Sequence, residues 1–215
     1  MNGLWSASRV ARQWQSLPEV LPRRHQVYSR QRDPLRISVV NGLDDVVAKV
    51  GNLLVAYPFS SAQETWLIEN RAEGGIGALV ANPYGTWARV GCLVAYRYPD
   101  GGVWNLGVVR HISEEDVDRF LGIELVSSGG VAVSLHEAND QRRVTDDCLG
   151  VWLAGGAPKE NQIRLLTPLG TYSPLAALHM RVHDRKYLLT PVQLIASGVD
   201  YQIGLYSAAA ANSAG

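Results

Sequence analysis

The feature that most constrains the fold is a long succession of short apolar runs separated by glycine, proline and polar residues. Runs of this length are typical of β-strands and are too short for ordinary helices. One segment differs, because its apolar residues recur at positions 43, 46, 47 and 50, which is a helical period. The chain is therefore predicted to be mainly β, with a short helix after the first strand. The first series of expected strands covers residues 37–40, 66–69, 76–80, 90–95, 104–110 and 121–125.

A polar stretch divides this series from a second one. We expect a first β domain over residues 31–130, a connection over 131–148 and a second β-rich domain over 149–206. Residues 1–30 are predicted to form a short amphipathic helix and a basic linker. The final residues, 207–215, are small and featureless and are predicted to be a disordered tail.

Two short motifs carry most of the functional information. Arg32 and Arg36 lie four residues apart, just before the first apolar run. Arginine supplies planar, permanently charged donors suited to phosphates and guanine edges. The second motif runs from Asn70 through Ala72 to Gly75, and its glycines let a ligand approach the backbone closely. Together the two motifs predict a site for an anionic nucleotide.

These residues resemble the signature of the PilZ family, RxxxR followed by [D/N]xSxxG, whose members are bacterial receptors for cyclic di-GMP. The strands that follow the second motif are also similar to the family's, over roughly residues 30–128. The resemblance implies a six-stranded antiparallel barrel over 31–130, followed by a second small β domain. It also implies that cyclic di-GMP is bound by Arg32, Arg36, Asn70, Ala72 and Gly75.

One position departs from the family pattern. Ala72 stands where the family has serine, which removes a hydroxyl group that can donate and accept a hydrogen bond. Alanine fits the turn sterically, so the departure concerns ligand affinity rather than the fold.

The charge of the chain is balanced overall but unevenly distributed. Its 20 basic and 20 acidic residues cancel, so no net charge attracts the chain to nucleic acid or to a membrane surface. Up to Arg36, however, seven arginines stand against Glu19 and Asp33, which is a local charge of +5. A basic N-terminal arm of this kind suits a small anion better than a nucleic-acid polymer. We expect the arm to become ordered when the ligand binds.

Other residue patterns favour structural roles. Cys92 lies in an apolar run, and two cysteines do not make a disulfide framework. His179 and His183 flank a strand-like run, in which a spacing of four is too wide to share a metal ion. His111 follows a strand and could line the ligand site or simply lie at the barrel rim. No catalytic constellation is evident, and we expect neither an enzyme nor a cofactor. A dinucleotide-binding fold at Gly74–Gly77 lacks the strand-then-helix context.

Two functions remain open at this point. The first is a cyclic di-GMP receptor that signals through ligand-induced ordering and contacts with a protein partner. The second is a PilZ-like scaffold with weak or no nucleotide binding that acts through protein contacts. Arg32 and Arg36 favour the receptor, and Ala72 favours the scaffold. No apolar run reaches the length of a membrane helix and no signal peptide is evident, so the sequence predicts a cytoplasmic location.

Overall fold

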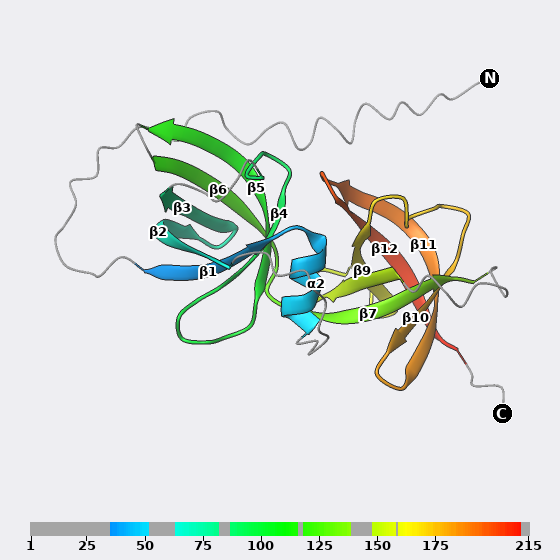
Figure 1. Cartoon of the computed structure of the whole chain (residues 1–215). Helices are drawn as coiled ribbons and strands as arrows, with labels where there is room; N and C mark the ends of the chain where they lie inside the picture. Colours follow the sequence, from blue (N-terminus) through cyan, green and yellow to red (C-terminus); the bar gives the residue numbers. More distant parts are fainter. Residues whose placement is uncertain are drawn as a thin grey trace, which may run out of the picture. The chain divides into compact units, whose positions relative to one another are not determined.

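The structure is a computed structural model that describes residues 35–51, 63–81, 87–115, 118–138, 148–157 and 159–211. The predicted helix and basic linker of residues 1–30, and Arg32, lie outside the described residues. Within the described ranges the chain is mainly strand with one helix, and the strands form two closed six-stranded barrels (Figure 1). The predicted mainly β fold, with a barrel followed by a second β domain, is confirmed.

The first barrel is antiparallel throughout, in the order β1-β2-β3-β6-β5-β4. The turn between β4 and β5 contains Gly101 at φ 90°, and its N–H donates a hydrogen bond to the carbonyl of Tyr98. Proline and glycine, which are typical turn residues, both occur in this segment. The strands are β1 Arg36–Asn41, β2 Glu64–Ala72, β3 Gly75–Ala81, β4 Leu93–Arg97, β5 Asn105–Glu115 and β6 Asp118–Ser127.

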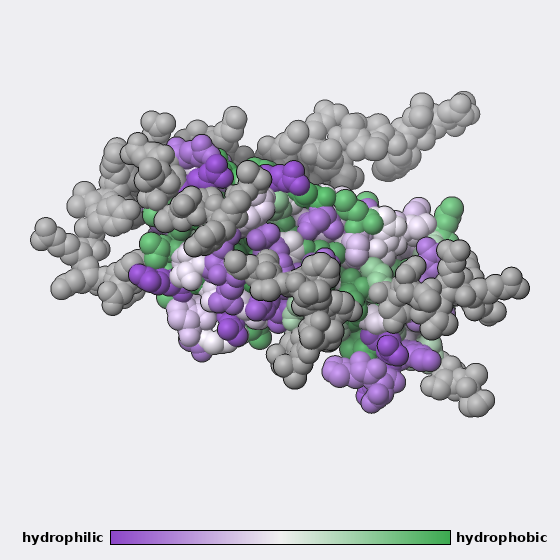
Figure 2. Space-filling model, viewed as in Figure 1, coloured by the Kyte–Doolittle hydropathy of each residue, from purple (hydrophilic) through white to green (hydrophobic). Residues whose placement is uncertain are grey.

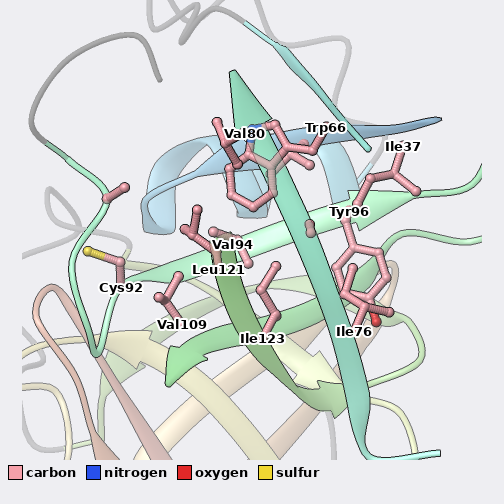
Figure 3. Close-up of a cluster of buried hydrophobic side chains, with 13 residues drawn as sticks. Ile37, Trp66, Ile76, Val80, Cys92, Val94, Tyr96, Val109, Leu121 and Ile123 are labelled. Atoms are coloured by element: carbon pink, nitrogen blue, oxygen red, sulfur yellow. The ribbon is translucent and has the colours of Figure 1, made fainter. Parts of the chain in front are cut away.

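Alternate residues of these strands fill the interior of the first barrel (Figure 3). Ile37, Val94 and Leu121 each lie almost completely buried there, because every second side chain of a strand points to the same face. The indole of Trp66 joins them, and its N–H donates to the carboxylate of the buried Glu64 at 2.8 Å. The Trp87 indole N–H donates to the same carboxylate at 2.9 Å, which satisfies a charge that would otherwise be costly to bury.

Helix α2, Leu43–Gly51, follows the first strand as the apolar period predicted. Asp44 and Asp45 lie in its first turn and Lys49 in its last, so the charges complement the helix dipole. The first free backbone N–H, that of Leu43, donates to a carboxylate oxygen of Asp200 at 2.9 Å. A residue 157 positions away therefore caps the helix.

The second barrel has the strand order β10-β11-β12-β9-β8-β7 and is also antiparallel. Two boundaries differ from the sequence expectation. Strand β7 occupies part of the segment expected as a connection, and β12 continues to Ala210, within the segment expected as a tail. Pairing with β11 gives the small residues at the end of β12 a strand structure that their composition does not indicate. The strands are β7 Gly130–Glu137, β8 Cys148–Leu153, β9 Gln162–Pro168, β10 Leu178–Val182, β11 Arg185–Ser197 and β12 Tyr201–Ala210.

A third apolar cluster joins the two barrels and contains α2. Leu93 and Leu106 from the first barrel, Val46 from α2, and Val151 and Tyr201 from the second barrel are all buried in it. On β4, for example, Leu93 of this cluster is followed by Val94 of the first barrel's interior, so one strand supplies both faces. The second β region is therefore packed against the first through a shared core.

Candidate functional site

The predicted ligand residues lie on β1, β2 and β3 of the first barrel. Arg36 begins β1, is exposed, and pairs directly with Leu67 of β2. Asn70 lies further along β2, and Ala72 ends that strand in register with Gly75 of β3. The structure thus brings four of the five predicted residues onto three adjacent strands. The fifth, Arg32, lies outside the described residues.

The β2–β3 hairpin explains why Gly75 must be glycine. A Cβ atom added there would overlap the carbonyl oxygen of Ile123 on the neighbouring strand β6. The adjacent residue, Gly74, accepts a hydrogen bond from the N–H of Leu125 at 2.8 Å. The hairpin therefore lies directly against the β6 backbone, and Ala72 is held exposed at its end.

The outer face of the barrel next to the hairpin carries two adjacent glycines. Asn70, Gly77, Gly122 and His111 are successive partners across β2, β3, β6 and β5. Their neighbours Ile76, Leu121 and Ile123 point into the barrel, so this row faces outward. We call Gly77 and Gly122 the glycine strip; it has an amide at one end and an imidazole at the other.

Two side chains lie over the glycine strip. A Cβ atom added to Gly77 would be 2.6 Å from both the Oδ1 atom of Asn70 and the Cζ atom of Phe120. At Gly122 the nearest atom is the Cβ of His111, at 3.2 Å. The absence of a side chain at Gly77 thus lets the Asn70 amide and the Phe120 ring approach the sheet, whereas Gly122 lies beside His111.

A second outward row lies beside the first and connects the arginine to the aromatic ring. Arg36 pairs with Leu67, Leu67 with Leu79, and Leu79 with Phe120, across β1, β2, β3 and β6. The three apolar side chains are half-buried. The face therefore combines a cation, an apolar surface with an aromatic ring, and an adjacent glycine strip over which the Asn70 amide lies.

Arg36 is available for a ligand, unlike several other arginines of this barrel. It makes no hydrogen bond or ion pair with any residue in the described ranges. By contrast, Arg110 pairs with Glu124, and Arg119 pairs with Glu114 at 2.9 Å. The guanidinium of Arg71 lies 4.8 Å from the centre of the Tyr98 ring, a cation–π contact.

The surroundings of the two cysteines favour a structural role over a reactive one. The thiol of Cys92 is buried and donates to the carbonyl of Trp87 at 3.0 Å. Burial raises the pKa of the Cys148 thiol, which lowers its fraction of reactive thiolate. Among the described residues, no group of three or more histidine, cysteine or acidic side chains is placed to hold a metal ion. None of the helical residues in the described ranges forms a segment long and apolar enough to cross a membrane.

Three features of this site were not identified from the sequence motifs. Gly77 and Gly122 lie in runs that were recognised as strands, and Phe120 directly precedes one of them, but only the strand pairing shows that they share one face. A glycine inside a strand pattern indicates that another group approaches the backbone closely, and Gly77 and Gly122 both lie inside such patterns. His111, considered as a site residue from its position, lies at the end of the same row.

Comparison with known proteins gives no match: no family model fits the chain, and no similar curated protein is found.

Proposed function

We propose that the chain is a receptor for cyclic di-GMP, which binds on the outer face of β1, β2, β3 and β6. The observation that carries this proposal is the convergence of Arg36, Asn70 and Gly75 on one face beside the glycine strip. Residues from two distant motifs gather there, and the motifs alone do not require them to do so. Arg32 is expected to act with Arg36, and its position lies outside the described residues.

Each part of this face suits one part of the ligand. The guanidinium of Arg36 can donate charge-assisted hydrogen bonds to a phosphate or to a guanine edge. Phe120, with the half-buried Leu79 beside it, offers a flat apolar surface for a base. Asn70 can donate and accept hydrogen bonds, and the missing side chain at Gly77 lets its amide lie close against the sheet. We infer that the nucleotide is bound and released unchanged.

Titration of the purified chain with cyclic di-GMP in a calorimeter tests the proposal. We expect saturable binding, and chromatography of the nucleotide after incubation should return intact cyclic di-GMP. Linear pGpG after incubation would show instead that the chain hydrolyses cyclic di-GMP and is an enzyme. Absence of binding heat at protein concentrations well above micromolar would refute the receptor proposal.

A scaffold function is the second candidate, and two observations favour it. Ala72 presents no hydroxyl group at the exposed end of β2. In addition, β11 extends beyond its pairing with β10, and Val192, Leu194 and Ile195 are exposed along the extension. Exposed apolar side chains on a strand edge are a usual surface for protein contacts. If cyclic di-GMP does not bind, this function is preferred.

A further inference from the structure

Two histidines from distant parts of the chain meet on the outside of the second barrel. His136 of β7 is the direct cross-strand partner of His179 of β10. Their imidazole rings stack with centroids 5.2 Å apart and planes inclined by 30°. The β7–β10 ladder is the one that closes this barrel, so the pair lies on the seam between its first strand and its fourth.

Both rings are open to a ligand. His136 is exposed and His179 is half-buried. Apart from their stacking, neither ring has a hydrogen bond or ion pair with another residue in the described part of the chain. A neutral imidazole has one nitrogen with a free lone pair and is the commonest metal ligand in proteins. Side chains directly opposite in antiparallel strands are close enough to share one partner.

We propose that His136 and His179 form a binding site for a divalent late transition-metal ion such as Cu²⁺, Ni²⁺ or Zn²⁺. Metal–nitrogen bonds are about 2.0–2.1 Å, so two nitrogens on one ion are at most about 4 Å apart. Rings whose centroids are 5.2 Å apart reach this spacing by small side-chain rotations. Imidazole ligands select these metals over Mg²⁺ and Ca²⁺, and Cu²⁺ is expected to bind most tightly.

The site is completed from outside the pair. No third histidine, cysteine or acidic ligand joins the two rings among the described residues, so water or a small exogenous ligand fills the other coordination positions. Arg181 lies two residues from His179 on the same strand and opposite Ser134 of β7. Its positive charge lowers the affinity for any cation, so we expect binding in the micromolar range. Figure 2 shows hydrophilic side chains gathered near the tip of the β10–β11 hairpin, next to this seam.

The sequence spacing suggests a different histidine pair, which provides the control. His183 follows His179 by four residues but lies in the β10–β11 turn, at φ 51°. It is exposed and is not a cross-strand partner of either ring. Replacing His183 therefore removes an imidazole near the site without changing the pair.

Calorimetric titration of the full chain with CuCl₂, NiCl₂ and MgCl₂ tests the inference. We expect one Cu²⁺ per chain, weaker Ni²⁺ and no Mg²⁺ binding, with the strongest site weakened at least tenfold in His136→Gln and in His179→Gln. His183→Gln should keep the wild-type affinity. Because the ion would connect β7 to β10, Cu²⁺ and Ni²⁺ should also raise the Tm of the wild-type chain but not of the two glutamine variants.

Circular dichroism before the titration shows whether each variant is folded, and we expect both to be folded because neither ring is buried in the core. Unchanged Cu²⁺ affinity in His136→Gln and His179→Gln would overturn the site. An equal loss in His183→Gln would also overturn it.

Discussion

Arg36 is the residue on which the ligand proposal depends most directly, because its guanidinium has no other partner among the described residues. We expect Arg36→Ala to lose one or more charge-assisted hydrogen bonds of about 1.5–3 kcal/mol. This is roughly a ten- to hundredfold loss of cyclic di-GMP affinity, measured by calorimetry. Stability should change little, since the side chain is exposed.

The control for Arg36 is Arg185→Ala, which removes an exposed arginine from the second barrel. Arg185→Ala should bind cyclic di-GMP as tightly as the wild type does, if the loss in Arg36→Ala comes from a local contact with the ligand. Equal losses in the two variants would show a general electrostatic attraction instead of a site.

Ala72 provides a prediction of the opposite sign. In Ala72→Ser the new hydroxyl group would stand at the exposed end of β2, opposite Gly75. We expect cyclic di-GMP to bind more tightly by one neutral hydrogen bond, about 0.5–1.5 kcal/mol, or roughly three- to tenfold. Parallel titrations of the two chains measure this, and weaker binding to the serine variant would favour the scaffold function.

At the scale of elements, the glycine strip determines whether β3 can hold Asn70 and Phe120 against the sheet. Gly77→Ala places a Cβ atom 2.6 Å from both side chains, so one of them must move. We expect a loss of about 1–3 kcal/mol in the free energy of unfolding, together with weaker ligand binding. Urea unfolding and calorimetry measure the two effects.

The matched control is Gly74→Ala in the adjoining turn. Apart from its chain neighbours, no described residue has a heavy atom within 4 Å of a Cβ atom added at Gly74. Its free energy of unfolding should stay within about 0.5 kcal/mol of the wild type. If Gly77→Ala were as mild as Gly74→Ala, the close approach over the strip would be unnecessary for both stability and binding.

Helix α2 gives a second prediction at this scale, because its N-terminus is capped from the second barrel. Asp200→Ala removes the acceptor of the Leu43 N–H and should lower the free energy of unfolding by about 0.5–2 kcal/mol. Asp200→Asn keeps an oxygen acceptor and should lose less. Thermal and urea unfolding compare the variants, and equal stability of the alanine variant would mean that water replaces the cap.

At the scale of the whole molecule, each of the three apolar clusters contains a buried tyrosine: Tyr96, Tyr201 and Tyr206. Burial raises the pKa of Tyr96 and of Tyr201 from 10.0 to about 12, and it also raises the pKa of Tyr206. An unfolded tyrosine ionises near pH 10, whereas these tyrosines stay protonated in the folded state. Stability is therefore complete below pH 10 and is lost as the pH rises from 10 to 12.

We expect the chain to unfold cooperatively in this pH range, with tyrosinate absorbance and loss of circular dichroism rising together. Tyr206→Phe is the most informative variant, because the buried Tyr206 hydroxyl has no hydrogen-bond partner among the described residues. Its removal should leave stability at pH 7 unchanged or higher and shift the alkaline transition upward. Titration of all tyrosines near pH 10 without unfolding would contradict the shared core.

Much of the fold follows from the sequence by itself. The alternation and length of the apolar runs are local properties, and they identify most strands and the helix from Leu43. They also place Arg36, Asn70 and Gly75 at strand ends and turns. The strand within the 131–148 segment was missed because its short apolar piece, Val131 to Leu135, is followed by a long polar stretch.

Only the tertiary structure decided which residues meet. Strand register places Gly77 beside Gly122, and barrel closure places His136 opposite His179. Asp200 reaches the N-terminus of α2 across the core between the barrels. These contacts join residues 43 to 157 positions apart. Local pattern cannot specify them, because a shift of one residue in register would turn each strand's side chains to the opposite face.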